Sequence, residues 1–218
     1  MRRIKSSSGA GGLVAALWLV VAGCGTGPET GTLQLLMTQD VSASGSISAS
    51  FAISGMAGDV PLTSIESIVL TVVQVDLKPF SEPEEEGGQW IRLPLTDPVS
   101  VDLLALPTVG GQEVAEGEVT ATSFKEIRLL CAGEATITLK ESVTVNGGLV
   151  IGDDEPLEQP LTIPSCESSG LKIKGGRFTV PGESETAVTV ELETDATVQS
   201  ISWNSNGFRM SPVMKLKG

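Results

Sequence analysis

Apolar and polar residues alternate with a period of two along several short stretches of the chain. The alternation is clear at residues 47–53, 135–139 and 188–192, and it is typical of β-strands with one buried and one solvated face. Residues 65–77 are more continuously apolar, which predicts a core strand in mid-sheet, covered on both faces. No long stretch has helical periodicity. The pattern therefore predicts an all-β protein.

Turn residues separate these runs and indicate how the strands connect. Asn146-Gly147 and Asn206-Gly207 each join two short apolar runs, and both residue types tolerate the positive φ of tight hairpin turns. About a dozen short strands with regular turns favour a two-sheet antiparallel β-sandwich, immunoglobulin-like or transthyretin-like. An open barrel is the alternative.

The N-terminal segment has the composition of an export signal. Three basic residues in the first five positions precede an unbroken apolar run at residues 13–22, and these form the basic and hydrophobic regions of a signal peptide. A run of this length is too short for an uncleaved membrane anchor, which needs roughly 20 apolar residues. Residues 21–23 resemble a lipobox, so we expect cleavage before Cys24 and acylation of Cys24.

This processing divides the chain into three parts. Residues 1–23 form the signal peptide, residues 24–30 the lipidated cysteine with a flexible tether, and residues 31–218 a single β-sandwich domain. Gly25 follows the cysteine in place of the aspartate that commonly retains lipoproteins at the inner membrane. We therefore expect an outer-membrane lipoprotein that faces either the periplasm or the exterior.

The charge of the chain restricts its partners. The sequence has 14 basic and 27 acidic residues, a net charge of −13. Loss of the three basic residues of the signal peptide leaves 11 basic residues, a net charge of −16. Nucleic acid is excluded as a partner because its recognition depends on Lys and Arg. The acyl chains are expected to be the membrane attachment, since the protein charge disfavours adsorption on anionic lipids.

Histidine is absent from the sequence. The chain therefore lacks the usual general base of Ser and Cys triads and the commonest transition-metal ligand. We expect no catalytic residues and no cofactor, although chemistry that needs only two carboxylates stays open. Ser169 and Lys172 match a Ser-x-x-Lys pattern by coincidence, because that pattern works on a helix and residues 171–174 read as a strand.

Cys131 and Cys166 are the two cysteines that remain after Cys24 is lipidated. Export places them in an oxidising compartment, so we expect a disulfide between them. Such a bond requires Cα atoms about 4.4–6.8 Å apart. Two buried thiols that pack as small hydrophobic groups are the alternative.

Two further groups are ligand candidates. Asp153, Asp154 and Glu155 could offer oxygen ligands to calcium, but an acidic loop is more often simply solvated. Trp90 and Trp203 could stack on sugar rings, but a tryptophan in a sandwich more often fills the core, which we expect for Trp90.

Several segments occur in a familiar order along the chain. They are residues 31–38, 65–77, Val101-Asp102-Leu103-Leu104, residues 124–129, Val190-Glu191-Leu192 and residues 207–213. Together they resemble the bacterial lipoproteins that carry the domain of unknown function DUF4382, and the Val-Asp-Leu-Leu and Ile-Arg-Leu pieces are the most specific. The chain departs from the usual Thr-Asp-Ala-Pro after the first strand. The resemblance implies an exported β-sandwich and no established activity.

These observations favour a lipid-anchored cell-envelope protein that is a non-enzymatic binding or structural module. Its expected partner is an envelope protein or a polysaccharide. One alternative is a carbohydrate-binding or carboxylate-based carbohydrate-active protein. The other is a calcium-stabilised adhesin-like domain.

Overall fold

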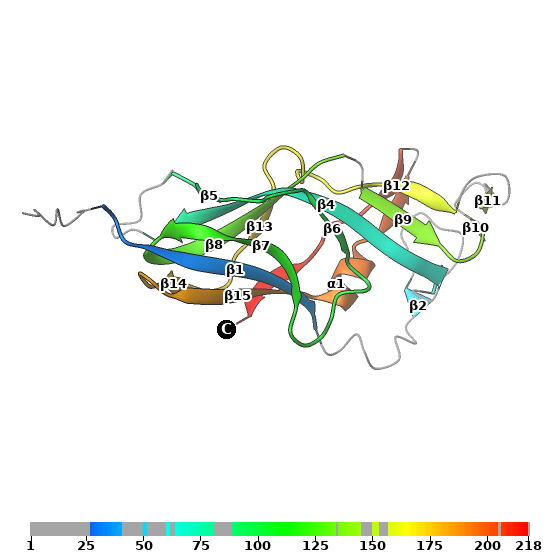
Figure 1. Ribbon diagram of the computed structural model, residues 1–218. Coiled ribbons are helices and arrows are strands. Elements are labelled where there is room, and N and C mark those ends of the chain that lie inside the picture. Colours follow the sequence, from blue (N-terminus) through cyan, green and yellow to red (C-terminus); the bar gives the residue numbers. More distant parts are fainter. Residues whose placement is uncertain are drawn as a thin grey trace, which may run out of the picture.

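Two main β-sheets pack face to face in the computed structural model of the chain (Figure 1). The structure describes residues 27–40, 50–51, 60–61, 64–80, 89–133, 135–144, 150–152, 157–204 and 206–217. The elements in chain order are β1 (Thr30–Gln39), β2 (Ser50–Phe51), β3 (Val60–Pro61), β4 (Ile65–Pro79), β5 (Ile91–Leu93), β6 (Val99–Asp102), β7 (Gln112–Thr120), β8 (Thr122–Cys131), β9 (Ala135–Leu139), β10 (Val143–Thr144), β11 (Val150–Ile151), β12 (Glu158–Thr162), β13 (Leu171–Ile173), β14 (Phe178–Val180), β15 (Glu185–Leu192), α1 (Thr194–Gln199), β16 (Ser202–Asn204), β17 (Gly207–Arg209) and β18 (Met214–Lys217).

The smaller main sheet has the strand order β18-β15-β1-β7. β1 runs parallel to β15 and antiparallel to β7. Alternate β1 residues Leu33, Leu35 and Met37 are fully buried. The residues between them therefore lie on the outer face of this sheet.

The larger sheet is organised around β4, its longest strand. β5 and β6 pair with one edge of β4, and β8 and β9 pair with the other. The predicted core strand at residues 65–77 is confirmed as a mid-sheet strand. The expectation of two covered apolar faces is wrong, because a register shift between Val72 and Gln74 leaves Gln74, Asp76 and Lys78 on the face away from the core.

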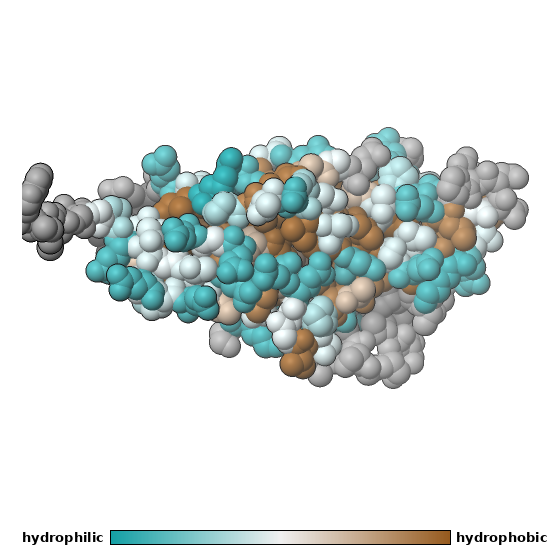
Figure 2. All heavy atoms as spheres, viewed as in Figure 1, coloured by the Kyte–Doolittle hydropathy of each residue, from teal (hydrophilic) through white to brown (hydrophobic). Residues whose placement is uncertain are grey.

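One hydrophobic core lies between the two sheets, and Phe124 and Phe208 are the largest side chains that it buries fully. The predicted sandwich is confirmed, and the described strands form no closed barrel. The expectation that the sheets are antiparallel is wrong in part: both sheets are mixed, because β1 pairs in parallel with β15 and β12 pairs in parallel with β17. Hydrophilic residues form a nearly continuous band along the side of the molecule seen in Figure 2, and hydrophobic residues gather near its middle.

Both predicted hairpins are present as antiparallel strand pairs. β10 pairs with β11, and the expected Asn146-Gly147 turn between them lies outside the described residues. β16 pairs with β17 through Asn204 and Gly207, so Gly207 belongs to the strand pair and not to the turn as predicted, and it has the positive φ of +97°. Of the predicted strand at residues 47–53, the structure describes only β2, which pairs with β3.

The Val-Asp-Leu-Leu segment has a structural role at the end of β6. Val101 and Leu103 are fully buried. Between them, Asp102 accepts hydrogen bonds from the backbone N–H of Ile68, at 3.2 Å, and of Leu104, at 3.0 Å. An aspartate that accepts backbone N–H groups is typical of a turn. The segment therefore fixes where the chain leaves the sheet.

Candidate functional site

A row of charged residues crosses four neighbouring strands on the outer face of the larger sheet. Asp76 on β4 lies opposite Arg92 on β5 and opposite Arg128 on β8. Arg128 in turn lies opposite Lys172 on β13. Their neighbours Val75, Leu77, Leu93, Ile127, Leu129 and Ile173 are buried in the core. Because side chains alternate between the two faces of a strand, these four charged residues share the outer face. They are called the basic row below.

Asp76 is the buried centre of the basic row, with a side chain only 4 % exposed. Gln74 Nε2 donates to both carboxylate oxygens, at 2.9 and 2.8 Å. Arg128 donates to Oδ2 through Nε at 3.1 Å and also through Nη2. A buried carboxylate needs such donors to offset its lost hydration. The network therefore holds the Arg128 guanidinium in one position.

The indole of Trp90 contacts the same guanidinium from another direction. Arg128 Cζ lies 4.4 Å from the centre of the Trp90 ring, and Lys78 Nζ lies 5.7 Å from it. A guanidinium over an aromatic face is attracted by the ring and stays planar against it. Arg92 Nε lies 3.6 Å from Asp76 Oδ1, and the Arg92 side chain is nevertheless 68 % exposed. The exposed Lys172 lies on the other side of Arg128, so both cations present charge to solvent beside this fixed centre.

A second pair of charged residues lies beside the basic row. Lys78 on β4 pairs with Glu126 on β8. Glu126 is 7 % exposed, and its Oε1 atom has no hydrogen-bond partner within the described part of the chain. On the outer face of β5, β4, β8 and β13, the basic row and this pair together contribute four cationic side chains and two carboxylates. This part of the face is therefore net positive on a chain that is strongly acidic overall.

The outer face of the smaller sheet has the opposite charge. Thr32 on β1 lies between Glu118 on β7 and Glu185 on β15. Gln34 lies opposite Glu116, and its Nε2 donates to Glu113 Oε2 at 2.6 Å. Two hollows of about 280 and 360 Å³ are lined by Glu116, Glu118 and Glu185 together with β1 residues. We call this surface the acidic face.

Glu191, near the other end of β15, is neutralised by the last strand. Lys217 Nζ and Lys215 Nζ lie 3.1 and 3.2 Å from the two Glu191 carboxylate oxygens. The hydrogen bond from Lys217 lowers the pKa of Glu191, and Lys215 acts in the same direction. Hydrogen bonds to Glu193 and then Glu191 raise the pKa of Lys215. These ion pairs attach β18 to the smaller sheet.

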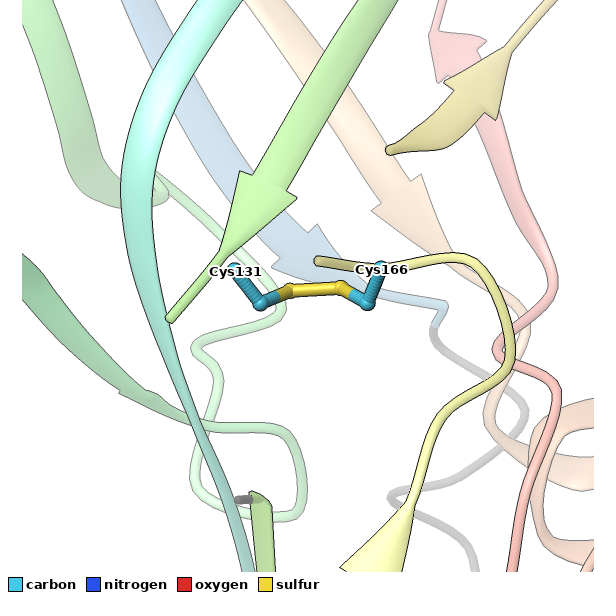
Figure 3. Close-up of a disulfide and its surroundings, with 2 residues drawn as sticks. All are labelled: Cys131 and Cys166. Carbon is cyan, nitrogen blue, oxygen red and sulfur yellow. A yellow bond between two sulfur atoms is a disulfide. The ribbon is translucent and has the colours of Figure 1, made fainter. Parts of the chain in front are cut away.

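The predicted disulfide between Cys131 and Cys166 is confirmed, with a Cα–Cα distance of 5.2 Å (Figure 3). Cys131 ends β8, and the chain then leaves the sheet briefly before β9. Cys166 lies in the loop between β12 and β13, and its carbonyl accepts a hydrogen bond from the Cys131 N–H at 3.0 Å. A cavity of about 330 Å³ lies beside the bond. The disulfide thus fixes the loop that leads to Lys172.

Several predicted residues lie outside the described part of the chain. These are Cys24 and the calcium candidates Asp153, Asp154 and Glu155. Among the described residues, no group of three or more His, Cys, Asp or Glu residues is placed to hold a metal ion. No helix among the described residues has the length and apolar character needed to cross a membrane.

The structure does not bring the two candidate tryptophans together. Trp90 precedes β5 at one edge of β4, whereas Trp203 lies on β16 at the far edge of the larger sheet, where its ring centre is 4.9 Å from that of Phe208. The expectation that Trp90 fills the core is wrong. Its ring is half-buried, because it packs against the cations of the outer face.

The Ser-x-x-Lys pattern lies on a turn followed by a strand. Gly170, with a φ of +73°, separates Ser169 from β13, which carries Lys172. The two residues therefore share no helix face, as expected. Lys172 instead belongs to the basic row, which the sequence alone did not predict. The signals that could have indicated the row are an aspartate inside an apolar strand and the arginine of the Ile-Arg-Leu segment.

Comparison with known proteins identifies one family. Residues 30–212 match the family model described as a domain of unknown function, DUF4382. No curated protein and no solved structure gives a match.

Proposed function

Since this chain belongs to the DUF4382 family, whose description names no activity, we propose a function from its own residues: a lipid-anchored cell-envelope protein that binds an acidic partner without catalysis. The basic row is its binding surface.

The observation that carries this proposal is the fixed position of Arg128. Asp76 holds the edge of the guanidinium and Trp90 covers its face. Arg92 and Lys172 flank it with exposed charges. A pre-organised guanidinium loses little conformational entropy when it binds a carboxylate or a phosphate. A positive patch on an acidic protein also selects and orients an acidic partner, because the rest of the surface repels it.

Anchoring through Cys24 suits this surface. β1 begins at Thr30, at one end of the elongated molecule (Figure 1), and Cys24 precedes Thr30 by six residues. A lipid at Cys24 would hold the sandwich by this end. Both outer sheet faces would then point sideways, accessible to neighbours in the envelope. The lipobox and Gly25 favour the outer membrane.

Binding without turnover agrees with the composition of the chain. Histidine is absent from the sequence. The Asp76 carboxylate accepts hydrogen bonds from Gln74 and Arg128, so its oxygens are occupied by protein donors. The carbohydrate-binding alternative receives less support, since Trp90 and Trp203 lie on distant strands.

Retention on acidic and neutral matrices tests the proposal. The intact chain, purified in detergent, is applied to poly-L-glutamate beads and to dextran beads. We expect retention on poly-L-glutamate alone, with release as the salt concentration rises, because salt screens contacts between exposed charges. The variant R92E/K172E should lose retention. Arg128 is not substituted, because the buried Asp76 carboxylate needs the hydrogen bonds that Arg128 donates.

A control variant with the same charge change decides the outcome. Lys140 and Arg209 are exposed and lie away from the basic row, so K140E/R209E should be retained like the wild type. Equal losses in both variants would show that only net charge matters. That result would contradict a binding surface at the basic row.

A further inference from the structure

The two outer faces of the sandwich carry opposite charges. The larger sheet presents the basic row, with Arg92 and Lys172 exposed. The smaller sheet presents Glu116, Glu118 and Glu185, all exposed. Because the buried faces of the two sheets meet in one core, the outer faces point in opposite directions. Each molecule therefore has a basic side and an acidic side.

The charges on the two faces also match in spacing. Arg92 and Arg128 lie on the two strands that flank Asp76. Glu118 and Glu185 lie in the same way on the two strands that flank Thr32. Neighbouring strands are about 4.8 Å apart, so each pair of charged positions is separated by about 10 Å. When the two faces meet in this register, the central Asp76 faces a threonine hydroxyl and not a carboxylate.

The shapes of the faces agree with this pairing. Hollows of about 280 and 360 Å³ on the acidic face are lined by Glu116, Glu118 and Glu185. The long side chain of Arg92 is 68 % exposed on the other face. A hollow lined by carboxylates can accept a guanidinium or ammonium group with charge-assisted hydrogen bonds.

We propose that the acidic partner is a second copy of this chain, whose acidic face docks on the basic row. The inference rests on the proposed function, because it names the partner of the same surface. A contact between two different faces of identical molecules leaves one basic and one acidic face open, so further copies can add and form a linear assembly. A lipid at one end of each sandwich would let the molecules of such an assembly stand side by side on one membrane.

The contact is expected to be weak and sensitive to salt. The contact is made by exposed charged side chains on small sheet faces. Interfaces of this kind are small and transient. Salt screens such contacts. Attachment to one membrane offsets the weakness, since it raises the effective concentration of neighbouring copies.

Sedimentation velocity of the intact chain, in density-matched detergent, tests the proposal. We expect the sedimentation coefficient of the wild type to rise with protein concentration at low salt and to fall back when salt is added. R92E/K172E and E118K/E185K should each stay monomeric. If the carboxylates added beside Asp76 impair folding, R92Q/K172Q replaces R92E/K172E, because it removes the two positive charges without adding negative ones. K140E/R209E should associate like the wild type.

Mixing the two charge-reversed variants gives the sharpest result. R92E/K172E keeps the native acidic face, and E118K/E185K keeps the native basic row. An equimolar mixture should therefore associate, although neither variant does so alone. A wild type that stays monomeric at all concentrations would overturn the proposal, as would a mixture that fails to associate.

A separate measurement distinguishes this inference from the proposed function. E118K/E185K retains the basic row, so it should still bind poly-L-glutamate beads. If it binds the beads while the wild type does not self-associate, the binding surface stands and the second copy is rejected as its partner. If neither bead binding nor self-association occurs, both proposals fail.

Discussion

Asp76 lies directly opposite Arg128 in the β4–β8 register, and its carboxylate accepts two hydrogen bonds from the Arg128 guanidinium. The Asp76 side chain is 4 % exposed and that of Arg128 is 21 % exposed. A buried ion pair is stable only when further hydrogen-bond donors satisfy its carboxylate. The Gln74 side-chain amide donates these hydrogen bonds to Asp76. This pair organises the basic row.

Removal of one partner should therefore destabilise the fold. We expect Asp76→Ala to lower the free energy of unfolding by about 2–4 kcal/mol, because it leaves a partly buried guanidinium without its carboxylate. Urea denaturation measures the change. In a double-mutant cycle with Arg128→Ala, the two effects should be non-additive by about 1–3 kcal/mol. Additive effects would show that the pair contributes no coupling.

Loss of the disulfide should lower the melting temperature. The bond closes a sequence separation of 35 residues, which corresponds to about 3–4 kcal/mol on the chain-entropy model. For a chain of this size we expect Cys131→Ala/Cys166→Ala to melt about 6–16 °C lower. Calorimetry of the wild type with a reductant should give a similar decrease and leave the double variant unchanged. A wild type unaffected by reduction would contradict this role.

The ion pairs of Glu191 should make β18 sensitive to acid. The hydrogen bond from Lys217 lowers the pKa of Glu191. A carboxylate with a lowered pKa stabilises the fold above its unfolded pKa of about 4.3, and this contribution is lost as the pH falls through the folded pKa. We expect Lys217→Met to melt about 1–3 °C below the wild type at pH 7.

This difference should disappear as Glu191 becomes protonated in the acidic range. Thermal melts between pH 3 and pH 7 follow it, with Lys140→Met as the control for loss of an exposed lysine. A difference that stays constant across this range would show that Lys217 acts through packing and not through the Glu191 charge.

Lipidation of Cys24 is the next prediction. We expect the exported protein to begin at Cys24, with acyl chains on its thiol and new amino group, and to sediment with outer membranes. Intact-mass analysis and membrane fractionation measure this. Cys24→Ser should remove the acyl mass and the outer-membrane location. A Cys24→Ser protein with unchanged fractionation would contradict the assignment.

The sequence predicted those elements whose signals are local. Residues 65–77 and 188–192 have clear apolar patterns, and both form strands, in β4 and β15. The disulfide followed from elimination, since only Cys131 and Cys166 remain after Cys24 is assigned to the lipid. The helix α1 was missed because its six residues are too short to show a helical period.

The candidate site could not be predicted in the same way. Arg92, Asp76, Arg128 and Lys172 lie far apart in the sequence and meet only through the registers of four strands. A one-residue change in any of these registers would move its charged residue out of the row. Trp90 was misassigned for the same reason, because the cations beside it come from β4 and β8.

Trp90 fluorescence tests the basic row as the binding surface most directly. Trp90 and Trp203 are the only tryptophans of the sequence outside the signal segment, so W203F reports on Trp90 and W90F reports on Trp203. If the basic row is the binding surface, poly-L-glutamate should produce a saturable change in the emission of W203F that salt reverses. The emission of W90F should not change. An equal change in both variants, or a change in W90F alone, would contradict binding at the basic row.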